Sequence, residues 1–171
     1  MNEESTTIST LLPVLIPIGT FILGFITSRF TMTKKERKDH LSRLQETSNK
    51  LSAELNDRFQ AFTAILNKYV QKVGEPDLDD FFNISTTGES YFSQCRTICD
   101  SILSGNVDKK SIENTHLPII KEVVKKSLPE FYDTLQGIAR KKNIQYNGTL
   151  KRENYKSIYE LYDKYKLGEN K

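Results

Sequence analysis

The hydrophobic pattern at the start of the chain is continuous rather than periodic. The run from Ile8 to Ile26 is interrupted only by Ser9, Thr10 and Thr20, and no charged residue occurs between Ser5 and Ser28. A helix rises about 1.5 Å per residue, so roughly 20 apolar residues cross a ~30 Å hydrocarbon core. The pattern therefore predicts a transmembrane helix at residues 8–28, preceded by a short extracytoplasmic N-terminus at residues 1–7.

Charge on the two sides of this segment predicts its orientation. Glu3 and Glu4 precede it, whereas a basic cluster follows it, and basic residues stay on the cytoplasmic side. We expect a retained signal-anchor in the cell (inner) membrane, single-pass, with the N-terminus outside and the C-terminal domain in the cytoplasm. A cleaved signal peptide is disfavoured, because it needs a basic start and a small-residue cleavage site. The juxtamembrane basic cluster, which could also bind anionic lipid headgroups, consists of Arg29, Lys34, Lys35, Arg37, Lys38 and Arg43.

A second pattern lies within the apolar segment, where small and weakly polar residues recur at spacings of three and four. Membrane helices associate where small residues permit close approach, so this face is a candidate interface for self-association or for a partner helix. The alternative is chance, because membrane helices tolerate these residue types. The face consists of Thr10, Pro13, Pro17, Thr20, Gly24 and Thr27.

From residue 33 to residue 73 the apolar positions recur near a 3.6-residue period, which predicts one long amphipathic helix. Its first half is thinly apolar, with Ser48 and Ser52 on the apolar face. We therefore expect a basic juxtamembrane stalk at residues 29–54, and the helix could continue from the transmembrane helix. A seven-residue repeat shared with the membrane face would favour a parallel coiled coil, and packing of this helix against its own domain is the alternative.

Residues 55–167 are expected to form the cytoplasmic helical domain, followed by a disordered tail at residues 168–171. The first helix should end at Gly74-Glu75-Pro76, and Asp77 should cap a short helix that reaches Phe82. A separate helical face runs from Tyr91 to Leu103 and closes at residues 104–106.

The remaining pattern begins at Leu117-Pro118 and continues to Ile138, with an interruption at Pro129 and Ser127 as a candidate cap. A final helix is expected from about Thr149, although the alternation around Asn147-Gly148 is also compatible with a hairpin. The predicted fold is all-α, with a single N-terminal transmembrane helix, a long amphipathic stalk helix and a small cytoplasmic helical bundle.

The inventory of reactive side chains is small. Histidine occurs only at positions 40 and 116, and the sequence contains no phosphate-binding loop, paired-histidine metal motif or nucleophile elbow. Cys95 and Cys99 lie one turn apart on an apolar face, as reduced core thiols would. The acidic group at residues 77–80 reads as a helix start rather than a calcium loop. We therefore expect no enzyme activity, no cofactor and no metal.

Composition adds an uneven charge distribution. Lysine and arginine total 25 against 22 acids, and the net charge of +3 combines an acidic stretch at residues 75–100 with a basic tail after residue 139. The tail mixes both signs and lacks a nucleic-acid-reading motif, so a solvated helix face is favoured over nucleic-acid binding.

These features predict a membrane-anchored, non-enzymatic interaction protein whose helical domain binds a partner protein, with homo-oligomerisation also expected. The alternative is an oligomeric membrane effector, such as a pore-forming toxin, a toxin regulator or a phage-defence component. It would assemble through the transmembrane helix. The candidate partner surface lies on the last helix and consists of Tyr155, Tyr159, Tyr162 and Tyr165.

Overall fold

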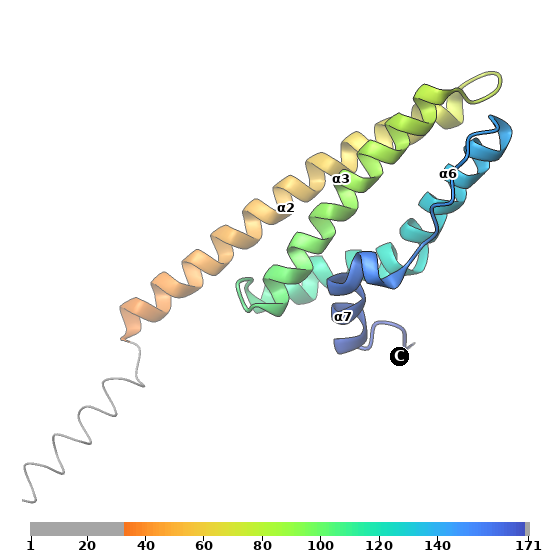
Figure 1. Ribbon diagram of the computed structural model, residues 1–171. Coiled ribbons are helices and arrows are strands. Elements are labelled where there is room, and N and C mark those ends of the chain that lie inside the picture. The colour runs from red at the N-terminus through yellow and green to blue at the C-terminus, as the bar shows by residue number, and fades with distance from the viewer. Residues whose placement is uncertain (1–32, 170–171) are drawn as a thin grey trace, which may run out of the picture. The chain divides into compact units, whose positions relative to one another are not determined.

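The computed structural model describes residues 33–169 (Figure 1), and throughout this range the secondary structure is helical, without strands. The chain forms two compact units, residues 1–42 and 43–171. The all-α prediction is confirmed. The described elements are α2 (Lys34–Gln71), α3 (Leu78–Leu103), α4 (Lys109–Ser111), the π-helical turn η1 (Ile112–His116), α5 (Leu117–Glu122), the π-helical turn η2 (Val123–Ser127), α6 (Leu128–Lys141), the 3₁₀ turn η3 (Arg152–Tyr155) and α7 (Lys156–Lys164).

No helix within residues 33–169 combines the length and the apolar character that a membrane crossing requires. The predicted transmembrane helix at residues 8–28 and its candidate interface lie outside the described residues.

The long helix predicted at residues 33–73 is confirmed as α2, and it has its own N-terminal cap. The Glu36 N–H donates to Thr33 Oγ1 at 3.2 Å, and the Thr33 N–H donates back to Glu36 Oε2 at 2.7 Å. This reciprocal pair is a capping box. α2 therefore begins at Lys34 with Thr33 as its cap. The predicted continuity with the transmembrane helix involves residues outside the described range. The Thr33 N–H and the Thr33 hydroxyl both donate to the Glu36 carboxylate, and these two hydrogen bonds lower its pKa.

Residues 78–103 form one helix, so the expectation of two separate helices in this stretch was wrong. The Asp77 cap is confirmed, because Asp77 Oδ1 accepts from the Asp80 N–H and Asp80 Oδ2 accepts from the Asp77 N–H, both at 2.8 Å. The polar stretch in the middle remains helical. Gly88 is buried there, and the Thr87 hydroxyl donates to the Asn83 carbonyl at 2.6 Å. The helix closes at Ser104-Gly105 as predicted, with Gly105 at a φ of 75°.

Residues 109–141 are helical without a break, and each of the two prolines lies two residues after the end of a π-helical turn. The helix begins at Lys109, upstream of the predicted start at Leu117, because the Asp108 side chain accepts from the Ser111 N–H. Ser127 has helical backbone angles and makes no capping hydrogen bond, so its predicted role as a cap was wrong.

The last helix starts later than predicted. No hairpin forms around Asn147-Gly148, and residues 144–151 have no regular secondary structure. The 3₁₀ turn η3 then leads into α7 at Lys156, not at Thr149.

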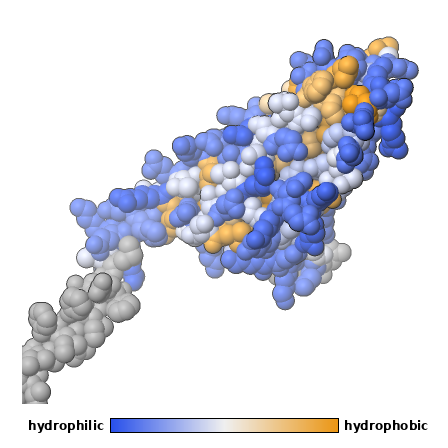
Figure 2. All heavy atoms as spheres, in the orientation of Figure 1, coloured by the Kyte–Doolittle hydropathy of each residue, from blue (hydrophilic) through white to orange (hydrophobic). Residues whose placement is uncertain are grey.

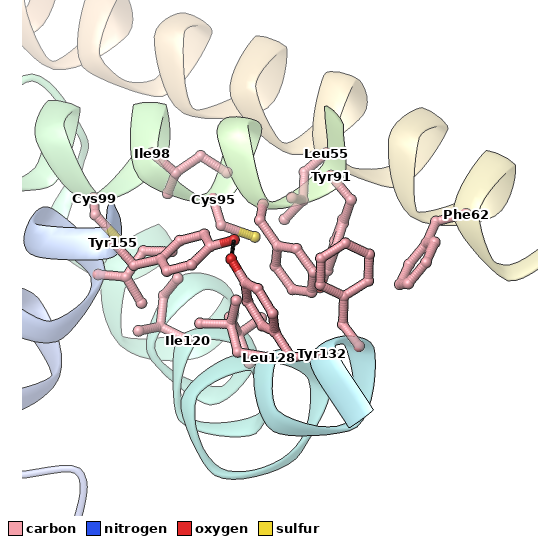
Figure 3. Packing of buried hydrophobic residues seen from close by; sticks show 14 of the residues in the cluster. Leu55, Phe62, Tyr91, Cys95, Ile98, Cys99, Ile120, Leu128, Tyr132 and Tyr155 are labelled. Carbon is pink, nitrogen blue, oxygen red and sulfur yellow. Dashed lines mark hydrogen bonds between the residues drawn. The ribbon is translucent and has the colours of Figure 1, made fainter. Parts of the chain in front are cut away.

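The core of the second unit is aromatic and lies where α3 packs between α2 and the later helices (Figures 1 and 3). Phe92 is fully buried, and its ring centroid lies 5.1 Å from that of Phe131 and 6.0 Å from that of Phe62. Leu55 and Phe62 of α2 are buried in this core, so α2 packs against its own domain, the alternative to a coiled-coil seam. Burial on α2 begins at Ser48, within the predicted stalk.

Candidate partner-binding groove

An apolar groove of about 400 Å³ opens on the second unit between α2 and the segment that contains the two π-helical turns. Leu55, Phe59, Tyr91 and Ile119 form its apolar surface. Leu55 and Tyr91 are buried, whereas Phe59 is 49% exposed, with its ring centroid 5.6 Å from that of Tyr91. The polar residues of the lining, which we call the groove rim, are Ser52, Asn56, Thr115, Glu122 and Ser127.

The two π-helical turns, together with α5 between them, form the side of the groove that lies opposite α2. The Leu117 N–H donates to the Ile112 carbonyl and the Leu128 N–H donates to the Val123 carbonyl, so each turn is one residue wider than an α-turn. Proline follows each turn, at positions 118 and 129. Its ring clashes with the carbonyl four residues earlier, and the wider turn accommodates this clash.

Polar contacts fix α2 against α3 beside the groove. The Arg58 guanidinium donates to the Ser90 carbonyl at 3.1 Å and to its hydroxyl at 3.2 Å. On the next turn, the buried Gln94 amide donates to Glu54 Oε2 at 3.1 Å. Hydrogen bonds to charged groups are stronger than neutral ones, so these contacts hold the α2 side of the groove against α3.

A second apolar surface lies at the turn between α2 and α3, and we call it the apolar tip. Its members are large hydrophobic residues exposed to solvent: Val70, Val73, Leu78 and Phe82. Val73 is fully exposed and Phe82 is 58% exposed. Figure 2 shows apolar surface gathered over the end of α2 and the start of α3. Compact monomers rarely leave such residues together without a partner.

The four tyrosines predicted as a partner surface divide into two groups. Tyr155 is buried, because η3 turns it into the core, where its hydroxyl lies 3.1 Å from that of Tyr132 (Figure 3). The same hydroxyl donates to Glu89 Oε1 at 3.3 Å. The prediction that Tyr155 lies on the surface was therefore wrong, and burial raises its pKa. Tyr159 is half-buried beneath the Arg152 guanidinium, 4.4 Å from the ring centroid. Tyr162 is half-buried and Tyr165 is exposed.

Among the predicted basic residues, those on α2 are all exposed: Lys34, Lys35, Arg37, Lys38 and Arg43. Arg29 lies outside the described residues. The membrane-facing role of this cluster stays a prediction.

A buried polar cluster, which sequence reasoning did not identify, joins α2 to η1. Ser48 Oγ and His116 Nε2 are hydrogen-bonded at 3.4 Å, and both residues are buried. Nδ1 of His116 and Oδ2 of Asp108 have no hydrogen-bond partner. Desolvation lowers the pKa of His116, and the nearby negative charge of Asp108 opposes this shift.

This cluster predicts that the free energy of unfolding decreases as the pH falls through about 6.5. The unfolded chain protonates His116 near its ordinary pKa, whereas the folded chain keeps the imidazole neutral to a lower pH. Protons therefore stabilise the unfolded state in this window. Urea unfolding of the full chain in mild detergent at pH values between about 5.5 and 7.5 measures the effect.

The matched comparison is His116→Gln against His40→Gln, which changes the same residue type at an exposed position on α2. His116→Gln should flatten the pH dependence of unfolding, and His40→Gln should retain the wild-type slope. If the free energy of unfolding of His116→Gln depends on pH as it does in the wild type, a group other than His116 causes the pH dependence. Shifted carboxylates do not interfere, since Glu75, Asp77 and Asp108 have pKa values below their ordinary ones and titrate at lower pH.

Cys95 and Cys99 are both buried on α3 and form no disulfide. Burial raises the pKa of the Cys95 thiol to about 12 and also raises that of Cys99. Both thiols are therefore protonated near neutral pH, and protonated thiols are poor nucleophiles and poor metal ligands. Within residues 33–169 there is no group of three or more His, Cys, Asp or Glu side chains placed to hold a metal ion.

Neither a protein-family model, nor a curated protein, nor a solved structure matches this chain.

Proposed function

We propose that this chain is a membrane-anchored, non-enzymatic interaction protein whose cytoplasmic helical domain binds a partner protein in the groove between α2 and the π-helical turns. The observation that supports this proposal most directly is the groove itself. It leaves Phe59 49% exposed beside the buried Tyr91 and Leu55. An apolar floor with a few polar groups on its edge is typical of recognition sites.

The mode of recognition that fits this groove is an amphipathic helix laid across it. Such a partner would insert apolar side chains above Leu55, Phe59 and Ile119 and would meet the polar rim at its edges. The predicted membrane anchor would hold the domain at the cytoplasmic face, where tethering raises the effective concentration of a bound partner.

The polar cluster at Ser48 supports a structural rather than a catalytic role. A nucleophilic serine requires an imidazole oriented by a carboxylate on its second nitrogen. Here Nδ1 of His116 lacks a hydrogen-bond partner, and both Ser48 and His116 are closed to solvent. A substrate could not reach the Ser48 hydroxyl in this arrangement.

The proposal is tested by placing a photo-cross-linking amino acid at Asn56 on the groove rim of the full chain in intact cells. The matched control carries the same amino acid at Asn106, which is an exposed asparagine outside the groove. Membranes are washed with alkaline carbonate before analysis. We expect the chain to remain in the membrane fraction and discrete adducts to form from Asn56 only.

Phe59→Ala should reduce these adducts severalfold, because it removes the exposed apolar contact. Extraction of the chain by carbonate would overturn the membrane anchor. Adducts that are equal at Asn56 and Asn106, or that are unaffected by Phe59→Ala in a folded chain, would overturn the groove as the binding site.

A further inference from the structure

We infer that the partner received by the groove is a second copy of this chain, which inserts its apolar tip and thereby forms a head-to-tail assembly. This inference rests on the proposed function, because it names the occupant of the same groove. Self-assembly is also what the alternative prediction, an oligomeric membrane effector, requires.

Two exposed residues of the apolar tip have the spacing of a helix that binds in a groove. Leu78 and Phe82 are four residues apart on the first turns of α3, so they project from the same face of a helix. Both are more than half exposed. Helices that bind in grooves present anchors at this spacing, and the groove offers Phe59, Tyr91 and Ile119 to receive them.

The two surfaces are also complementary in charge. Residues 70–82, which contain the tip, carry four acids against the single base Lys72. Lys72 pairs with Asp77 and Asp80, and Lys142 pairs with Glu75, so Asp79 is the acid of this stretch with no ion pair within residues 33–169. Residues 121–126 flank the groove and carry three lysines against one acid, Glu122, which is the member of this stretch that lines the groove. Lys126 reaches the groove rim, because its Nζ lies 3.9 Å from Glu122 Oε1. Opposite charge at the edges of an apolar contact favours this pairing and sets its direction.

A chain cannot fill its own groove with its own tip. Phe59 and Val70 both lie on α2, and the 11-residue separation along a helix corresponds to about 16 Å. The tip of each copy therefore cannot occupy the groove of the same copy. In the head-to-tail arrangement that we infer, the contact is heterologous, and each copy retains one free surface for the next.

The experiment uses two full-length variants in mild detergent, Val73→Cys at the tip and Asn56→Cys at the groove rim, distinguished by tags. A bismaleimide cross-linker is added to each variant alone and to a mixture of the two. The native cysteines are fully buried and do not react in the folded chain. We expect tip-to-groove adducts in the mixture, severalfold above the adducts in either single-variant sample.

Phe82→Asp in the tip variant should abolish these adducts, whereas Asn83→Asp, which adds the same charge at the adjacent exposed position, should leave them. Lys126→Glu in the groove variant should weaken them, and Asp79→Lys in the tip variant should restore them. Retention of helical content by circular dichroism shows that each variant is folded.

Absence of adducts in the mixture of folded variants overturns the inference, and so does cross-linking of the tip variant with itself at the same level. The proposed function is separable from this result. Photo-adducts from Asn56 to a protein other than this chain would support the proposed function while overturning self-assembly. Absence of any specific photo-adduct would overturn both.

Discussion

Replacement of Phe92 by alanine is expected to lower the free energy of unfolding by about 3–5 kcal/mol. Phe92 is fully buried, and rings from α2, from α6 and from η3 surround it, with centroids 6.0 Å away for Phe62, 5.1 Å for Phe131 and 6.1 Å for Tyr155. Replacement of the Phe92 ring by a methyl group would leave a cavity, because the three surrounding elements cannot all move inward to fill it. Urea unfolding of the full chain in mild detergent, followed by far-UV circular dichroism, measures the loss.

Phe82→Ala is the matched control, since it makes the same chemical change on the same helix at a residue that is 58% exposed. We expect this substitution to change the free energy of unfolding by less than about 1 kcal/mol. Equal losses for Phe82→Ala and Phe92→Ala would show that the aromatic cluster does not hold the second unit together.

Helix existence and most helix ends could be predicted from the sequence, because they depend on local chemistry. The 3.6-residue period predicted α2, and the acidic start at Asp77 predicted the cap of α3. Gly74 and Gly105 both have positive φ angles, which glycine adopts readily. A glycine at each position was therefore a usable signal for the end of a helix. The capping box at the start of α2 was also present in the sequence, as Thr33 and Glu36 three residues apart.

The predictions that were wrong failed because tertiary contacts determine the structure at those positions. The polar stretch before Tyr91 resembles a break, and it is helical because Gly88 lets α6 approach α3 closely. Tyr155 shares a helical period with Tyr159, yet η3 replaces the first turn of the expected helix and directs Tyr155 inward.

The groove could not be predicted, because its lining comes from residues between positions 52 and 127 on five elements. One signal did exist. The pairs Leu117-Pro118 and Leu128-Pro129 are 11 residues apart, and each follows the π-helical turn that accommodates its proline. The sequence indicated an interruption at the second pair, but not that the helix would continue through it.

Gly88→Ala is expected to lower the free energy of unfolding by about 1–3 kcal/mol, although alanine ordinarily stabilises a helix relative to glycine. A Cβ at this position would overlap the ring of Phe131. That ring cannot move away cheaply, because it is buried with its centroid 5.1 Å from that of Phe92 and 5.9 Å from that of Phe62. Urea unfolding of the full chain measures the loss.

Gly137→Ala is the matched control, because it adds the same methyl group to the helical glycine of α6, where nothing lies within 4 Å of the new atom. This variant should gain about 0.5–1 kcal/mol from its helix propensity. If the collision causes the loss at Gly88, then Gly88→Ala should cost less in a Phe131→Leu background than in the wild type, since the two residues share one space. A stabilising Gly88→Ala would instead mean that α3 and α6 are not packed as closely as the glycine permits.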